Sequence, residues 1–289
     1  MTTGTIELKA SDFRSGINPD WCPGCGDFGV LNSLQRACAE LGLQPHRILT
    51  VSGIGCSSNL PGYINSYGMH TLHGRSLAFA TGAKLANHEL TVIATGGDGD
   101  GYGIGGNHLT HTARRNVDIT YIVMNNQIYG LTTGQISPTS RLDMKTKSTP
   151  YGNVETPINP ITSAIMNGAS YVARAYSGDI RHTTAIIKAA IEHKGFSLVD
   201  IFSPCVTFND DNSTISLRKG DPNSRIRDTM RAIGKPLVKR PWNGDPLSIL
   251  DSFSKTKRMQ VWGLESQSLL MDRYPPGRLE SPRIRPKSC

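Results

Sequence analysis

Short apolar runs alternate with longer amphipathic segments through the first 210 residues of the chain. The apolar runs are bounded by Gly, Asn or Pro, which is typical of strands, and they cover residues 47–53, 89–97, 118–126, 170–176 and 197–204. The segments between them carry apolar residues at helical spacing and predict helices over residues 28–43, 72–87, 103–116 and 179–195. Strands that alternate with helices predict an α/β fold with a doubly wound, mostly parallel sheet.

The predicted strands are apolar along their whole length, as parallel strands covered on both faces are. In doubly wound sheets, ligands bind at the carboxyl ends of the strands. Glycine-rich segments follow directly after residues 47–53 and at the end of residues 89–97. We therefore expect the functional site at that edge of the sheet.

The alternating pattern stops near residue 210, and residues 211–289 contain eight prolines without a periodic run. We expect a binding domain over residues 1–210 and an irregular, basic, proline-rich C-terminal extension over residues 211–289. The first region holds 15 basic and 15 acidic side chains, and the second holds 16 basic and 8 acidic. A basic segment can attract nucleic acid or an acidic partner, but most such segments are simply solvated. Nucleic-acid binding is not expected, because the segment lacks interleaved aromatic residues and a recognisable module.

Composition narrows the class of protein further. The chain is 37% hydrophobic and 19% charged, which is typical of a globular protein. It contains no apolar run of the roughly 18 residues needed to cross a membrane, and no secretory signal pattern near residue 1. We expect a cytoplasmic protein without a membrane partner. The six cysteines should then be reduced, so that metal or redox roles are favoured over disulfides.

The segment GGDGDGYGIGG, residues 96–106, combines glycines with two acids directly after a predicted strand. Glycines let the backbone approach a ligand, and a helix that begins near residue 103 would present N–H groups to an anion. Asp98 and Asp100 are themselves negative, so an anion there requires a cation such as Mg²⁺ between them. The segment is neither a Walker A loop nor a dinucleotide fingerprint. It predicts a metal–phosphate site.

A second oxygen donor follows the next predicted strand, in NNQIYG at residues 125–130. The spacing of Gly97-Asp98-Gly99, 25 further residues and Asn125-Asn126 resembles the thiamine diphosphate signature. This resemblance implies a thiamine diphosphate-binding fold. It also implies that the Asp98 carboxylate, the Asn126 amide and the Ile128 backbone carbonyl bind Mg²⁺.

The motif WCPGCG, residues 21–26, places two cysteines three positions apart. Two more cysteines, Cys56 and Cys205, lie at predicted strand ends on the edge where the glycine-rich loops are expected. Four thiolates can hold a [4Fe–4S] cluster or a zinc ion, and Cys22 with Cys25 alone could form a redox dithiol. The residues by themselves leave these alternatives open. The other two cysteines, one inside a predicted helix and one at the last position, are expected to bind nothing.

Several motifs together resemble the β subunit of the 2-oxoacid:ferredoxin oxidoreductases, and most closely its 2-oxoglutarate branch. They are WCPGCGDFGVL, SGIGCSS, LHGR, GGDGDGYGIGGNH and NNQIYGLTTGQ, and the likeness extends over residues 18 to 210. The resemblance implies that residues 1–210 bind thiamine diphosphate, Mg²⁺ and a [4Fe–4S] cluster. The cluster ligands that it implies are Cys22, Cys25, Cys56 and Cys205.

The same resemblance assigns the residues around thiamine diphosphate. The implied contacts are Ile54, Gly55, Cys56, Ser57, His73, Gly74, Arg75, Gly99, Asp100, Gly130 and Leu131. Within this set, His73 and Arg75 are expected to be catalytic: the imidazole could move a proton, and the guanidinium could bind phosphate or a substrate carboxylate. A hydrogen-bonded, purely structural histidine remains an alternative for His73.

The activity implied by the resemblance is oxidative decarboxylation of a 2-oxoacid, with 2-oxoglutarate expected to give succinyl-CoA and CO₂. Electrons would pass singly through the cluster to ferredoxin. No acid in the chain suits activation of the thiamine pyrimidine ring, so we expect an α subunit to supply it, in an (αβ)₂ assembly that is inactive without it. The alternatives are a pyruvate enzyme, a thiamine-dependent decarboxylase without electron transfer, and a non-catalytic basic binding protein.

Overall fold

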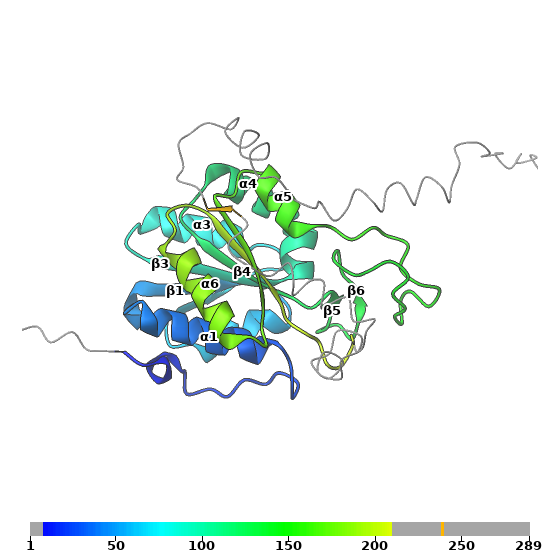
Figure 1. The fold of residues 1–289 in the computed structure, drawn as a ribbon, viewed down its shortest axis with the longest axis horizontal. Coiled ribbons are helices and arrows are strands. Elements are labelled where there is room, and N and C mark those ends of the chain that lie inside the picture. Colours follow the sequence, from blue (N-terminus) through cyan, green and yellow to red (C-terminus); the bar gives the residue numbers. More distant parts are fainter. Residues whose placement is uncertain (1–7, 210–237, 240–289) are drawn as a thin grey trace, which may run out of the picture. The chain divides into compact units, whose positions relative to one another are not determined.

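Six parallel strands and a short antiparallel edge strand form the main sheet (Figure 1) of a computed structural model that describes residues 8–209 and 238–239. The strand order is β2-β1-β3-β4-β8-β7-β9, in which only the pair β7–β9 is antiparallel. These strands are β1 (Ile48–Ser52), β2 (Tyr67–His70), β3 (Thr91–Gly97), β4 (Thr120–Asn125), β7 (Tyr171–Tyr176), β8 (Ser197–Phe202) and β9 (Val238–Lys239). A separate two-stranded ribbon pairs β5 (Ile128–Tyr129) with β6 (Gln135–Ile136).

Helices cover both faces of the sheet, as Figure 1 shows. The α-helices are α1 (Asp27–Glu40), α2 (Leu60–Tyr63), α3 (Ser76–Ala86), α4 (Gly106–Arg115), α5 (Pro160–Met166) and α6 (Ile180–Glu192). Helices α1 and α6 bury their apolar side chains on one face, and α3, α4 and α5 bury theirs on the other. Short 3-10 turns occupy Ala10–Phe13, Pro45–Arg47 and Cys56–Asn59.

Strand β4 shows why the sheet needs two helical layers. Ile122 and Met124 face the layer of α1 and α6, whereas Tyr121 and Val123 face the other layer. All six residues of the strand are buried. Successive strand residues point to opposite faces, so a strand that is apolar throughout is stable only where both faces are covered. The predicted doubly wound α/β fold is confirmed.

Each of the five predicted strands contains an observed strand, but β2 has no counterpart in the prediction. Its sequence, YGMH, lies at the edge of the sheet and is mostly exposed. An exposed edge strand needs no apolar run, so hydrophobic pattern does not reveal it.

Two predicted helices begin later than expected. Helix α3 begins at Ser76, because Gly74 has φ +71° and its N–H donates to Asp100 Oδ1, which makes the preceding residues a turn. Helix α4 begins at Gly106 and follows a π-helical turn over Gly99–Ile104, which is kinked at Gly103. The anion-binding helix start expected near residue 103 was wrong: the first helical turn after β3 begins at Gly99.

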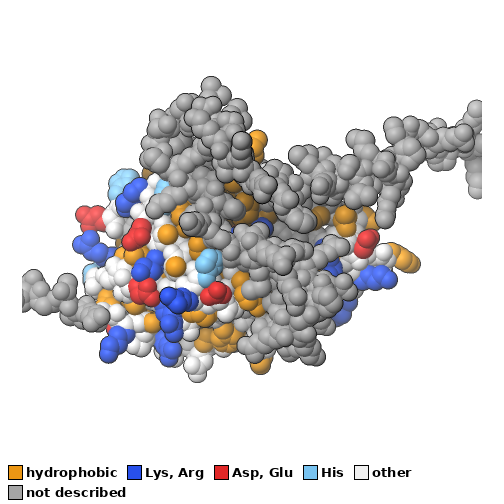
Figure 2. Space-filling model, in the orientation of Figure 1, with side chains coloured by type: hydrophobic (Ala, Val, Ile, Leu, Met, Phe, Trp, Pro, Cys, Tyr) orange, Lys and Arg blue, Asp and Glu red, His pale blue; other side chains and the backbone are white. Residues whose placement is uncertain are grey.

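The predicted C-terminal extension lies outside the described residues except for β9, and the proposed boundary at residue 210 stays a prediction. All of the described residues belong to one compact unit. On the face shown in Figure 2, basic and acidic side chains of the described part are interspersed. No helix within residues 8–209 is long and apolar enough to span a membrane.

Candidate functional site

A cavity of about 100 Å³ opens at the carboxyl ends of the parallel strands. The loops after β1, β2, β3 and β4 form its wall, and Asp27 at the start of α1 completes it. All the sequence-predicted cofactor contacts except Gly74 and Arg75 line this cavity, as do Asp98, Asn126 and Ile128. Segments far apart in the sequence therefore meet at the expected edge of the sheet.

Asp98 is buried in the cavity wall directly after β3 and is 1% exposed. Burial raises the pKa of its carboxyl group to about 6, although hydrogen bonds from Ser137 and Thr139 act in the opposite direction. A buried carboxylate is costly unless a cation or hydrogen-bond donors compensate its charge. The environment of Asp98 therefore suits a bound cation.

The two asparagines after β4 point in different directions. Asn126 lines the cavity, and its Oδ1 accepts a hydrogen bond from the Ile128 N–H at 3.1 Å. Asn125 is buried and its amide donates to Asp200 Oδ1 at 3.1 Å, away from the cavity wall. Between Asn126 and Ile128, Gln127 has φ +60°, so the chain turns sharply there. Of the two asparagines, Asn126 is therefore the one that can reach a ligand.

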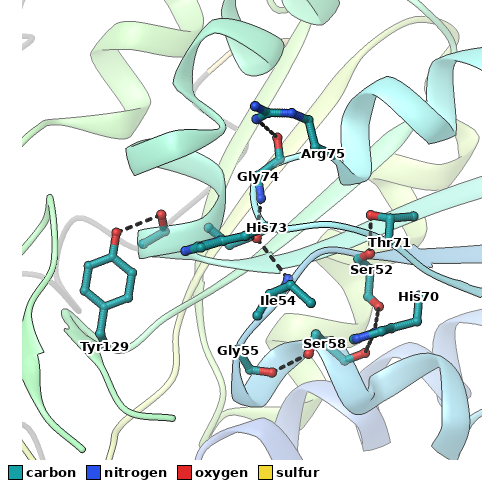
Figure 3. A network of polar contacts seen from close by, with 12 residues as sticks. Ser52, Ile54, Gly55, Ser58, His70, Thr71, His73, Gly74, Arg75 and Tyr129 are labelled. Carbon is teal, nitrogen blue, oxygen red and sulfur yellow. Dashed lines mark hydrogen bonds and ion pairs between the residues drawn. The ribbon is translucent and has the colours of Figure 1, made fainter. Parts of the chain in front are cut away.

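The side chain of Asp100 ties three loops together beneath the cavity. Its Oδ1 accepts hydrogen bonds from Ile54 N at 2.9 Å, from Gly74 N at 2.7 Å and from His73 Nδ1 at 2.8 Å. Figure 3 shows Ile54, His73 and Gly74 close together. Its other oxygen, Oδ2, is buried without a hydrogen-bond partner among the described residues. Asp100 thus positions the cavity wall, a role that the spacing of the acids did not reveal.

His73 and Arg75 lie on opposite sides of Gly74 (Figure 3). The His73 side chain is 40% exposed and lines the cavity, with its ring edge-on to Tyr129 at 6.2 Å between centroids. Since Nδ1 donates to the Asp100 carboxylate, Nε2 is the nitrogen left for chemistry. Arg75 does not line the cavity, and its guanidinium lies 3.4 Å from Gly74 O. The structure therefore brings His73 to the site and leaves Arg75 outside its wall.

Three cysteine-bearing loops meet beside the cavity. The Gly26 N–H donates to Pro204 O at 3.1 Å, which joins the Cys22–Cys25 loop to the Cys205 loop. A side chain at Gly130 would begin 3.6 Å from Cys56 Sγ and 3.8 Å from Cys205 Sγ, so both sulfurs lie against this glycine. The loops that carry Cys22 and Cys25, Cys56 and Cys205 therefore lie close together at the end of the sheet.

Electrostatics links the same cysteines. Burial and the charge of Asp27 raise the pKa of the Cys56 thiol to about 11, with further contributions from Cys205 and Cys22. Burial and Asp27 also raise the pKa of Cys25, and Cys56 and Cys205 contribute. Within residues 8–209, no three His, Cys, Asp or Glu side chains lie at the spacing of ligands around a single metal ion. The cysteines are close enough for the charges of Cys205 and Cys22 to act on Cys56, and those of Cys56 and Cys205 to act on Cys25.

Asp27 is a cavity residue that the sequence prediction missed. It is 2% exposed and accepts a hydrogen bond from Ser203 Oγ at 2.5 Å, which joins the start of α1 to the end of β8. Burial raises the pKa of its carboxyl group to about 6, and the charge of Asp98 raises it further. The sequence does place Asp27 directly after the two-cysteine motif, and this position could have indicated that it lies at the site.

Trp21 was also missed, although it stands at the start of the motif. Its Nε1–H donates to Cys56 O at 2.7 Å, and its ring packs edge-on against Phe28 and Tyr63 at 5.3 and 5.0 Å between centroids. This one side chain fastens the two-cysteine loop to the Cys56 loop.

Replacing Trp21 with phenylalanine should keep the aromatic packing and remove the hydrogen bond to Cys56 O. We expect a loss of about 1 kcal/mol, or a melting temperature roughly 2–4 °C lower. Differential scanning calorimetry of the full chain measures this, with Tyr151→Phe at a fully exposed position as the control. An unchanged melting temperature for Trp21→Phe would show that the bond does not hold the loops.

The chain matches the family described as thiamine pyrophosphate enzyme, C-terminal TPP binding domain, over residues 53–201. This range begins in the loop after β1 and ends in β8, so it contains the loops that line most of the cavity.

Individual proteins are similar to this chain over about two thirds of its length or more. The β subunit of 2-oxoacid:ferredoxin oxidoreductase 1 from Aeropyrum pernix is 54% identical over 200 residues, which cover 69% of this chain and 63% of the relative. The 2-oxoglutarate synthase subunit KorB from Archaeoglobus fulgidus is 45% identical over 210 residues, 73% of this chain and 78% of that protein. The match to the Aeropyrum protein thus spans less than two thirds of that relative's length.

A solved structure is similar over nearly the whole chain. It is a 2-oxoglutarate:ferredoxin oxidoreductase from Magnetococcus marinus, described with 2-oxoglutarate, coenzyme A and succinyl-CoA bound. The TM-score is 0.77 at 40% sequence identity, and the match covers 93% of this chain and 97% of that one.

Proposed function

The chain belongs to the family of 2-oxoacid:ferredoxin oxidoreductase β subunits, and on that premise we propose that it carries the cofactors of a CoA-acylating 2-oxoacid oxidoreductase. The reaction would convert a 2-oxoacid and coenzyme A into an acyl-CoA and CO₂ and would reduce ferredoxin. The observation that carries this proposal is that Cys56 lines the same cavity as Asp98 and Asn126, with other cysteines beside it. A thiamine site and an electron acceptor would then share one wall.

We propose 2-oxoglutarate as the substrate, with succinyl-CoA as the product. The support comes from relatives: KorB proteins from three archaea, which are named as subunits of 2-oxoglutarate synthase, are 44–46% identical to this chain. The similar solved structure carries 2-oxoglutarate and succinyl-CoA in its description.

The residues present fit thiamine diphosphate and Mg²⁺. Asp98, Asn126 and the Ile128 carbonyl would supply the oxygen ligands that Mg²⁺ prefers. The buried hydroxyl of Ser57 in the cavity wall has no hydrogen-bond partner among the described residues, as expected for a group that meets a ligand. When bound, thiamine diphosphate would supply the electron sink for decarboxylation. The chain's own part would be to hold the diphosphate on the Gly99 and Asp100 backbone and against Gly130 and Leu131.

The cysteines fit a [4Fe–4S] cluster better than a zinc ion. A single zinc draws all its sulfurs to about 2.3 Å from one point, whereas a cluster binds each cysteine through a different iron. Cys22 and Cys25 share one loop, whereas Cys56 and Cys205 come from two separate loops and do not form the second close pair that structural zinc sites typically use. Burial raises the thiol pKa of Cys25 and Cys56, so thiolates at these two positions would need a compensating cation, which the irons of a cluster would provide. When bound, the cluster would accept electrons singly.

His73 would be the proton-transferring group of this chain. Its Nδ1–H is held by the Asp100 carboxylate, which orients the ring and leaves Nε2 as the nitrogen for proton transfer. Arg75 lies outside the cavity wall, so we propose it as a contact for a substrate or phosphate group only in the assembled enzyme.

Replacing His73 with glutamine should lower kcat by about 100-fold, since a positioned acid or base typically contributes that much. Thiamine diphosphate affinity should change little, because Asp98 and Asn126 remain. Steady-state kinetics with 2-oxoglutarate and methyl viologen measures the effect, and His111→Gln on the exposed surface of α4 serves as the control. Equal activity of both variants would identify His73 as a structural residue.

An α subunit is part of the proposal. Among the described residues, the acids that line the cavity are Asp27, Asp98 and Asp100, and no glutamate is present there. The glutamate that activates thiamine would come from the partner, in a cytoplasmic (αβ)₂ assembly that reduces ferredoxin. A basic C-terminal segment would also favour encounter with an acidic ferredoxin.

Anaerobic purification of the chain alone and together with its α subunit tests the proposal. We expect the complex to contain iron and thiamine and to reduce methyl viologen with 2-oxoglutarate faster than with pyruvate. Faster reduction with pyruvate would show that the proposed substrate is wrong and would leave the proposed reaction class in place. Full turnover by the chain alone would exclude the need for a partner, and a complex with thiamine but without iron would indicate a plain decarboxylase.

A further inference from the structure

Two hydroxyl groups from a distant turn hold the carboxylate of Asp98. Ser137 Oγ and Thr139 Oγ1 each donate to Asp98 Oδ2 at 2.5 Å, and all three side chains are at least 95% buried. Both bonds fall on the same oxygen, so together they limit rotation of the carboxylate. Neither hydroxyl belongs to the cavity wall, and the proposed function gives them no role.

The same turn reaches the other proposed ligand loop. Thr139 Oγ1 lies 3.1 Å from Asn125 Oδ1, and Ser140 Oγ donates to Gln127 O at 2.6 Å. Gln127 is held in the left-handed region, which costs a non-glycine residue about 1–3 kcal/mol unless its surroundings impose it. Its N–H is bound by Asn125 Oδ1 at 3.2 Å. The bonds from Asn125 and Ser140 thus stabilise the sharp turn that carries Asn126.

The turn is itself closed by internal hydrogen bonds. Ser140 N donates to Ser137 O at 3.0 Å, and Ser137 N donates to Ser140 Oγ at 2.7 Å. Pro138 occupies the second position, where its fixed φ favours a β-turn. Such a turn can hold its hydroxyl groups at a constant separation.

We propose that the turn over residues 137–140 positions the metal site, with Thr139 as its central residue because it alone touches both ligand-bearing loops. The turn's bonds to Asp98, Asn125 and Gln127 hold the Asp98 carboxylate and the loop that carries Asn126 in a fixed relative position. The inference rests on the proposed thiamine–Mg²⁺ function and adds to it the residues that determine metal affinity. Groups that orient metal ligands typically change affinity by about 10–100-fold when removed.

The experiment measures Mn²⁺ binding by electron paramagnetic resonance, with Mn²⁺ replacing Mg²⁺, in the complex of the full chain with its α subunit and thiamine diphosphate. Thr139→Val removes the hydroxyl at nearly constant volume, and Thr139→Ser retains it. Thr120→Val is the matched control, because it also removes a buried threonine hydroxyl bond, at the opposite end of β4.

We expect the Mn²⁺ dissociation constant to rise about 10–100-fold in Thr139→Val and to stay near the original value in Thr139→Ser and Thr120→Val. Turnover of Thr139→Val should recover at saturating metal, which a general loss of structure would not allow. If Thr139→Val does not fold, Ser137→Ala, which removes one of the two donors to Asp98, should weaken binding about tenfold.

Unchanged Mn²⁺ affinity in Thr139→Val overturns the inference and leaves the proposed function intact. If Thr139→Val does not fold, unchanged affinity in Ser137→Ala has the same meaning. An equal loss in Thr120→Val overturns it as well, because the effect would then be one of stability. If the unmodified complex itself binds no Mn²⁺ with thiamine diphosphate, the proposed function fails and the inference with it.

Discussion

Alanine in place of Cys56 is expected to abolish iron binding and 2-oxoacid-dependent electron transfer together. The proposed [4Fe–4S] cluster has four cysteine ligands, and Cys56 is the one of them that also lines the cavity. Iron analysis of the anaerobically purified complex should fall from about four atoms per chain towards zero. Methyl viologen reduction with 2-oxoglutarate should fall to the background rate.

Cys38→Ala is the control for this experiment. Cys38 is fully buried inside α1, among apolar neighbours and away from the cavity wall. Its loss should leave the iron content unchanged and cost only a small cavity. Retention of iron and of dye reduction by Cys56→Ala would refute the assignment of this cysteine, and release of zinc instead of iron would identify a structural metal.

Asp98→Ala should remove the response of the protein to thiamine diphosphate and Mg²⁺. At ligand concentrations about 100 times the dissociation constant, binding stabilises a protein by about 2.7 kcal/mol. The original complex should therefore melt several degrees higher with both ligands than without them, and Asp98→Ala should show no such increase. Turnover should be lost in the same variant.

The matched control is Glu89→Ala, which removes a carboxylate whose side chain is 79% exposed. It should gain the same stabilisation from thiamine diphosphate and Mg²⁺ as the unmodified complex. A full ligand response in Asp98→Ala would mean that another group binds the metal. Unfolding of Asp98→Ala without ligand, recorded in parallel, separates loss of binding from loss of fold.

Much of the fold was predictable because its signals are local. Strands β3 and β4 are continuous apolar runs, and a chain can only bury such runs between two helical layers. The thiamine signature was predictable for the same reason, since Asp98 and Asn126 follow these two strands and parallel strands end at one edge. The exposed edge strand β2 was missed, because burial imposes no pattern on it.

The residues that hold the site in place were not predictable from the chain. Asp98 and Asp100 stand two positions apart among glycines, yet they have different partners. Asp98 accepts hydrogen bonds from Ser137 and Thr139, and Asp100 accepts them from the N–H groups of Ile54 and Gly74. These partners are 26 to 46 residues away in the sequence. No local spacing indicates which loop will present a donor to which acid.

The sequence by itself thus determined the doubly wound sheet, the edge at which the cavity opens and the residue types that gather there. Tertiary structure alone decided that Asp100 orients His73, that Trp21 fastens two cysteine loops and that Arg75 stays outside the cavity wall. The physical reason is the distance along the chain over which each kind of interaction acts. Hydrophobic periodicity acts over one strand or helix, whereas a buried hydrogen bond depends on which distant loops the completed sheet brings within about 3 Å.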